Sequence, residues 1–242
     1  MRGPNRCPPT MTSPIQPRFD IYSSIHKALR ALMADTLFKL GRMDPDDPQD
    51  VARTARDVRR LLDVCRAHAD HENRFIHPLL EVHAPGASRA VVYEHADHDE
   101  EAGRIGAAAA GLATCHAGQR TLAAAALYRS LALFIASNFE HQHLEETVHN
   151  AVLWTHCTDA EIMNLHHALT ESIAPEELLF ILRWLVPAMP PAERTATMRN
   201  LRRAAPAAFQ AAMDMLQAHL SDGEWSRLLQ GLAQEDPQGV EA

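Results

Sequence analysis

The chain has few aromatic residues, few cysteines and no stretch of alternating apolar and polar residues long enough for a β-strand. Aromatics make up 5% of its 242 residues, whereas alanine and leucine are abundant, which favours helices packed on helices. Apolar residues reach 46%, the level of ordinary globular proteins, so a buried core is expected. We therefore predict an all-α protein.

The cysteines are widely separated, and no two of them form a Cys-X-X-Cys pair. They are Cys7, Cys65, Cys115 and Cys157. This spacing argues against a disulfide framework, a zinc ribbon or an iron–sulfur site, and it indicates a reducing compartment, which we take to be the cytoplasm.

Basic tracts and long apolar runs are also lacking. The net charge is −8, and no basic tract is longer than the arginine pair at 59–60 or at 202–203, so no nucleic-acid partner is expected. Charged residues interrupt the apolar runs before they reach the ~20 residues of a membrane span, so no membrane is expected either. The arginine-rich stretch 53–66 is interpreted as the solvated face of a helix.

Proline and glycine divide the chain into three parts. Residues 1–18 are proline-rich and are predicted to be a disordered leader, 19–157 an up-down-up-down four-helix bundle, and 158–242 a C-terminal helical extension. The helices of the bundle are expected at about 19–41, 49–82 and 120–154, with the third beginning near 88 and ending between 111 and 118. Ser88 is a good N-cap for the third, and Pro78 is expected to end or kink the second.

Histidine is in excess, since 14 of the 15 histidines precede residue 168. Each helix of the bundle carries apolar residues at steps of three and four, as a buried helix does. At one level of each helix, histidines and glutamates take the place of the apolar residues. An unpaired buried carboxylate is costly, so this level is expected to hold a cation.

The order of these residues along the chain supports a single site. His26 and His95 lie near the starts of their helices and His68 and His141 in the second halves of theirs, so an antiparallel bundle brings them to one end. A glutamate follows His68 and His141 by four residues, on the same helix face. The candidate metal ligands are His26, His68, Glu72, His95, His141 and Glu145, with His98 available as a seventh. This set is too large for one tetrahedral zinc and suits two carboxylate-bridged ions of iron or manganese.

The other histidines of the bundle mostly fall off the inward-facing positions. His71, His77, His83, His116, His143, His149 and His156 are expected at the solvated surface, with His71 or His149 available as a hydrogen-bond partner of a ligand. Tyr22, one turn before His26, is expected in the core, where its hydroxyl either finds another partner or faces a metal-bound oxygen species. Cys65 is expected to be a small core residue.

Four segments resemble the hemerythrin/HHE cation-binding family: 26–30, 68–78, 94–95 and 140–146. The resemblance covers about 19–154. It implies two non-haem irons joined by an oxo or hydroxo bridge, with manganese or zinc as substitutes. By this resemblance the terminal ligands are His26, His68, His95 and His141, and the bridges are Glu72 and Glu145. His95 follows the acidic residue usual at that point of the family's third helix, and His98 is left open as a further ligand.

The resemblance implies a di-iron protein that binds or senses O₂, NO or peroxide, in oxidative or nitrosative stress or in iron handling. The alternative is a di-iron oxidase or peroxidase, or an iron donor for iron–sulfur cluster repair. The repair proteins of this family carry an N-terminal cysteine pair, whereas Cys7 stands alone here. A third hypothesis gives the extension 158–242 the task of binding a protein partner.

Overall fold

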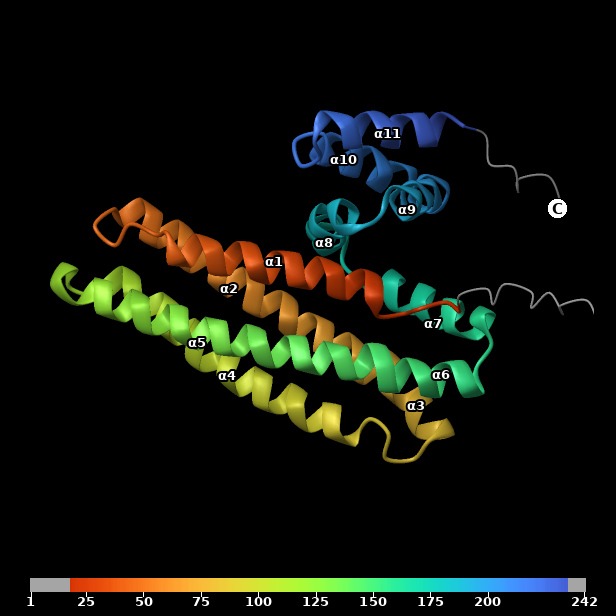
Figure 1. Cartoon of the computed structure of the whole chain (residues 1–242), viewed down its shortest axis with the longest axis horizontal. Helices are drawn as coiled ribbons and strands as arrows, with labels where there is room; N and C mark the ends of the chain where they lie inside the picture. The colour runs from red at the N-terminus through yellow and green to blue at the C-terminus, as the bar shows by residue number, and fades with distance from the viewer. Residues whose placement is uncertain (1–17, 235–242) are drawn as a thin grey trace, which may run out of the picture.

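The computed structural model describes residues 18–234, and these residues form helices and connecting segments without a strand (Figure 1). The all-α prediction is thus confirmed for the described chain. Residues 1–17 of the predicted leader lie outside the described residues.

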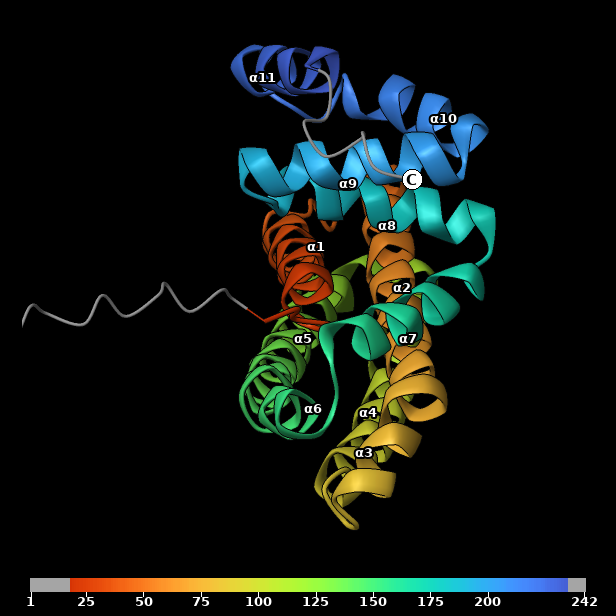
Figure 2. The same ribbon diagram turned by 90° about the vertical axis from the view of Figure 1, so that its right-hand side faces the viewer.

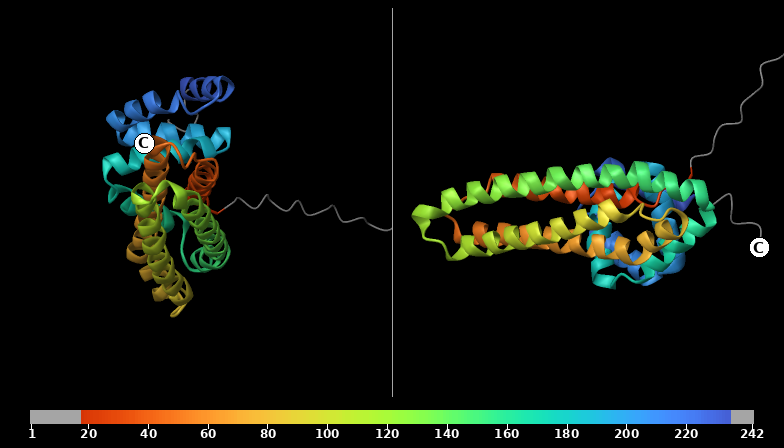
Figure 3. Two further views of the ribbon diagram at one scale, coloured as in Figure 1. Left: turned by 90° about the vertical axis from the view of Figure 1, so that its left-hand side faces the viewer. Right: turned by 90° about the horizontal axis from the view of Figure 1, so that it is seen from below.

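Four long helices run side by side, and successive ones point in opposite directions (Figures 1 and 3). They are α1 (Ser23–Gly41), α2 (Pro48–His71), α4 (Arg89–Thr114) and α5 (Ala117–Leu144). Two of them are prolonged without a break: α2 by η1 (Glu72–Ile76) and α3 (His77–His83), and α5 by η2 (Glu145–His149) and α6 (Asn150–His156). The segments η1 and η2 are π-helical, with the wider turn of i→i+5 hydrogen bonding.

The second helix continues through Pro78 to His83, so the proline does not end it. Pro78 lies in the first turn of α3, directly after η1. The wider π turn before it gives the proline ring room that a regular α-helix lacks.

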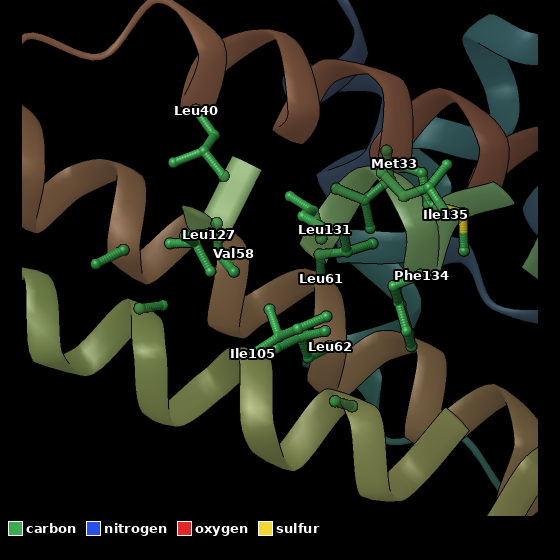
Figure 4. Close-up of a cluster of buried hydrophobic side chains, with 14 of the residues drawn as sticks. Met33, Leu40, Val58, Leu61, Leu62, Ile105, Leu127, Leu131, Phe134 and Ile135 are labelled. Carbon is green, nitrogen blue, oxygen red and sulfur yellow. The ribbon is translucent and has the colours of Figure 1, made fainter. Parts of the chain in front are cut away.

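The core between the four helices is built from apolar residues at steps of three and four (Figure 4). Leu61, Ile105 and Leu131, from three different helices, are each 1% exposed or less. The core also receives Phe180 and Trp184 from α8, so the C-terminal helices are joined to it.

The C-terminal helices follow the bundle, and most of them stack on the side of α1 (Figure 2). They are α7 (Asp159–Glu171), α8 (Pro175–Ala188), α9 (Pro191–Ala204), α10 (Pro206–Leu216) and α11 (Asp222–Ala233). Helices α8–α11 enclose a core of their own, and α8 packs across α1.

Helix α7 packs against the end of the bundle formed by α3 and α6, where Ile162 joins Leu80 and Leu153 in a third apolar cluster. Arg18 ties the start of the described chain to the same place. Its side chain donates hydrogen bonds to the Asp159 carboxylate and to the backbone carbonyls at 154 and 157.

One helical run, 118–156, is long and apolar enough to span a membrane by length and composition. Arg129 is the one charged residue between Arg120 and Glu140, so charged residues interrupt this run less often than we expected from the sequence. In the structure it packs between α1 and α4 and buries the polar residues His141 and Glu145. Of the most apolar window of this run, 28% is buried in the structure.

The loop before α4 is held by one carboxylate. Ser88 was expected to cap this helix, but its side chain makes no cap, because its hydroxyl donates to Glu81 at 2.6 Å. Glu81 also accepts from the backbone N–H groups of Gly86 and Ser88, which holds its pKa down at about 2. Gly86 has φ +89°, a value that side chains with a β-carbon rarely adopt.

We therefore expect Gly86→Ala to destabilise the protein by about 1–2 kcal/mol, the cost of left-handed backbone for an L-residue. Gly111→Ala is the matched control, because this helical glycine has nothing within 4 Å of the added carbon. It should stabilise by up to about 1 kcal/mol. Urea unfolding of both variants measures the difference, and equal effects would contradict the role given to Gly86.

Candidate metal centre

Two buried carboxylates form the middle of the site. Glu72 is 1% exposed and Glu145 is 0% exposed. Each is the first residue of a π-helical segment, Glu72 of η1 and Glu145 of η2. Short π-helical segments within α-helices occur frequently at functional sites.

The first group of ligand atoms comes from α1, α2 and the two glutamates. His68 Nε2 lies 3.1 Å from Glu72 Oε1. His26 Nε2 lies 3.8 Å from the same oxygen and 3.4 Å from Glu145 Oε2. All four ligand atoms lie within 4.8 Å of one another, so the group can hold a metal ion.

The second group uses the same glutamates from the other side. His95 Nε2 lies 3.3 Å from Glu72 Oε2, and His141 Nε2 lies 3.3 Å from Glu145 Oε1. The two imidazole nitrogens are 3.0 Å apart. Each carboxylate therefore turns one oxygen to each histidine pair, and this second group can also hold a metal ion.

The outer nitrogens of three histidines are held by neighbouring side chains. The outer nitrogen of His26 contacts Glu146 at 3.0 Å. That of His95 contacts Asn73 at 3.1 Å, and that of His141 contacts Glu94 at 2.7 Å. Such partners fix the ring so that Nε2 points inward, as in metal sites.

Unpartnered polar atoms gather at this point. Among the described residues, eight buried side-chain atoms of His26, His68, Glu72, His77 and Glu145 make no hydrogen bond. Buried polar atoms are rarely left unpaired, and each one costs stability. Imidazole nitrogens and carboxylate oxygens that face a common centre, yet do not bond to one another, fit a bound cation.

The carboxylates also control protonation. Burial by itself lowers the pKa of His26, but the hydrogen bond to Glu146 and the nearby Glu72 and Glu145 raise it to about 9. For His141, burial is likewise outweighed by Glu145 and Glu94, and the pKa is about 9. The pKa of Glu72 lies well below its usual value, because His68, His26 and His95 outweigh the effect of its burial. In the metal-free protein, His26 and His141 are thus protonated at pH 7 and lie beside the ionised Glu72.

The structure does not place His98 in either group. Its Nε2 contacts the hydroxyl of Ser137 at 2.9 Å, and its ring meets that of His141 edge-on at 5.2 Å. His98 is half-buried and lies one turn beyond His95 on α4. It is a neighbour of the cluster.

Two histidines that were expected at the surface are buried, which corrects the sequence analysis. His77 is 4% and His149 0% exposed, and together with Glu145 they form a third group of ligand atoms within 4.8 Å. His149 follows Glu145 by four residues and so shares its helix face, whereas His77 is turned inward by the π turn. His77 follows Glu72 by five residues. In an α-helix, side chains five residues apart point in different directions, whereas in the wider π turn they lie on the same side of the helix. Burial lowers the pKa of His77 to about 4, so it is neutral at pH 7.

The remaining expectations are met in most cases. The histidines at 83, 116, 143 and 156 are exposed, and His71 is half-buried. Tyr22 is buried, with its hydroxyl 3.3 Å from His149 Nδ1. Cys65 packs against the bundle core, and its burial raises the pKa of its thiol to about 12.

No protein-family model, curated protein or solved structure matches this chain.

We expect the metal-free protein to lose stability as the pH rises from about 7 to 9. In this interval His26 and His141 stay protonated in the folded chain, whereas histidines of the unfolded chain, with a pKa near 6.5, are neutral. The folded state binds more protons, so each of these groups lowers the unfolding free energy by up to about 1.4 kcal/mol per pH unit. Urea unfolding at several pH values measures the slope.

The double variant His26→Gln, His141→Gln is expected to flatten that slope. His143→Gln is the matched control, because His143 is exposed on the same helix as His141. A slope that survives the double variant would show that other groups cause it.

Proposed function

We propose that this chain is a hemerythrin-like protein with a non-haem di-iron centre that binds or senses O₂, NO or peroxide. The observation that carries the proposal is the arrangement of Glu72 and Glu145, each with one oxygen towards each histidine pair. Two metal ions sharing both carboxylates use every one of these atoms. The likeness of the ligand order to the hemerythrin/HHE family favours iron, and nitrogen–oxygen ligands of this kind suit it.

The chain's own residues have separate tasks in this proposal. His26 and His68 would hold one ion and His95 and His141 the other, while Glu146, Asn73 and Glu94 keep the rings in place. Iron, when bound, supplies a position at which a small ligand can coordinate and a metal that changes oxidation state.

The surroundings keep bulk water out and leave hydrogen-bond donors inside. Leu29, Met33, Ile105 and Phe134 are buried in the bundle core, and Phe75 is half-buried at the end cluster. His77, neutral at pH 7 and without a hydrogen-bond partner in the described chain, can donate to a small ligand. The free cysteines at 65, 115 and 157 agree with a cytoplasmic protein.

The metal content of the protein tests the proposal directly. Protein loaded anaerobically with ferrous salt should bind about two irons per chain and, in air, show the near-ultraviolet bands of an oxo-bridged pair. Metal analysis and absorption spectra measure both. A folded protein that refuses iron would end the proposal.

The variant Glu145→Gln tests the bridge. It keeps the shape of the side chain but removes the charge, so the fold should persist while iron affinity falls at least about tenfold, the loss seen even for outer partners of a metal site. Glu140→Gln is the matched control, because Glu140 is exposed on the same helix. It should retain full iron content. Far-ultraviolet circular dichroism checks the fold of both.

A further prediction separates the proposed function from its enzymatic alternative. The reduced, iron-loaded protein should show a stoichiometric spectral change with O₂, NO or peroxide, because the site offers binding groups in a closed apolar setting. Sustained consumption of peroxide, or transfer of iron to an apo iron–sulfur acceptor, would favour an oxidase, a peroxidase or a repair protein instead.

A further inference from the structure

An open pocket of 530 Å³ lies between α2 and α4, and arginines of α2 line one side of it. They are Arg56, Arg59, Arg60 and Arg66, and Asp63 is the one acidic residue among the described lining residues. No ligand of the candidate metal centre lines the pocket.

Arg56, Arg59 and Arg66 lie on one side of α2, at spacings of three and seven residues, and Arg60 lies one turn after Arg56 beside them. Like charges this close on one face destabilise a helix. The chain as a whole has a net charge of −8, so this local excess of positive charge runs against its composition. Asp63 and Asp99 offset part of this charge through Arg66, and a bound anion would offset the rest.

Glycines of α4 keep the opposite side of the pocket open. A β-carbon at Gly103 would meet only Arg66 Nη2, at 3.7 Å, and one at Gly106 only Leu62 Cδ1, at 3.7 Å. Glycine weakens the interior of a helix relative to alanine. Here its effect is that α4 places no side chain at 103 and 106, and the one α4 side chain on these guanidinium groups is Asp99, which accepts from Arg66.

Two of the arginines are held in place, and two have no partner. Arg66 donates to the Asp99 carboxylate at 2.5 Å, and the Arg60 guanidinium lies 4.2 Å from the centre of the Phe180 ring of α8. Within residues 18–234, Arg56 and Arg59 make no hydrogen bond or ion pair. The pocket therefore combines a fixed part with two free guanidinium groups.

We propose that this pocket binds a small organic phosphate that carries a di- or triphosphate group. Guanidinium groups bind phosphate oxygens through paired hydrogen bonds, and several of them match a ligand with several negative charges. The pocket is larger than a single phosphate needs and falls in the usual range for small-molecule sites, about 300–1,000 Å³. This inference does not rest on the proposed function.

The test is calorimetric titration of the full-length, metal-free chain with ADP, pyrophosphate, inorganic phosphate and citrate at one low salt concentration. ADP and pyrophosphate should bind at least about tenfold more tightly than inorganic phosphate, because they engage more guanidinium groups. Citrate binding as tight as pyrophosphate binding would overturn the assignment to phosphates, and no binding of ADP or pyrophosphate would overturn the site.

Charge variants locate the binding. Arg56→Gln and Arg59→Gln should each weaken ADP binding about tenfold or more. Arg53→Gln is the matched control, because Arg53 lies on the same helix, pairs with Asp50 and does not line the pocket. An equal loss in the control would show that the ligand responds to general charge, and the proposal would fall.

A steric variant tests the pocket without changing charge. Gly106→Leu fills the space opposite the arginines and should weaken ADP binding at least about tenfold. Gly111→Leu makes the same change one to two turns further along α4, where nothing lies within 4 Å, and should leave binding unchanged. Unimpaired binding by Gly106→Leu would place the ligand elsewhere. Because the titrations use metal-free protein, failure of the di-iron proposal leaves their outcome intact.

Discussion

The end of the bundle is organised around two carboxylates that have been taken out of water. Ionised oxygens in such a place require positive charge nearby, and the surrounding histidines supply it either as imidazolium ions or by binding metal. Glu146, Asn73 and Glu94 then hold the outer nitrogens of those histidines. Protons and metal ions thus compete for one set of atoms, so the charge state of the site and the stability of the fold are linked.

Much of this end could be predicted from the sequence because an α-helix repeats regularly. Apolar steps of three and four showed which faces are buried, and antiparallel order placed His26, His68, His95 and His141 at one end, where the structure brings them together. His98 could not be assigned in this way, since it lies one turn from His95 and its position depends on a contact with Ser137.

Other features depend on information that no single helix carries. His77 was misplaced because the helical repeat changes at Glu72, and nothing in the local sequence marks a π turn. His149, four residues after Glu145, shares its face in a regular helix as well. The arginines of α2 were interpreted as a solvated face, whereas the pocket that they line is completed by Ala102, Gly103 and Gly106 of another helix, α4. Ser88 does not cap α4, because its hydroxyl donates a hydrogen bond to the Glu81 carboxylate of the preceding helix.

The π segments have a consequence for the parts of the molecule beyond them. One residue added to a helical turn rotates everything that follows by about 100° around the axis. The apolar faces of α3 and α6 are therefore out of phase with those of α2 and α5, and they meet each other and Ile162 of α7 in the terminal cluster. Each of the two prolonged helices thus consists of two helical segments in different registers, which meet at Glu72 or Glu145. The terminal cluster can therefore vary in sequence without shifting the central core.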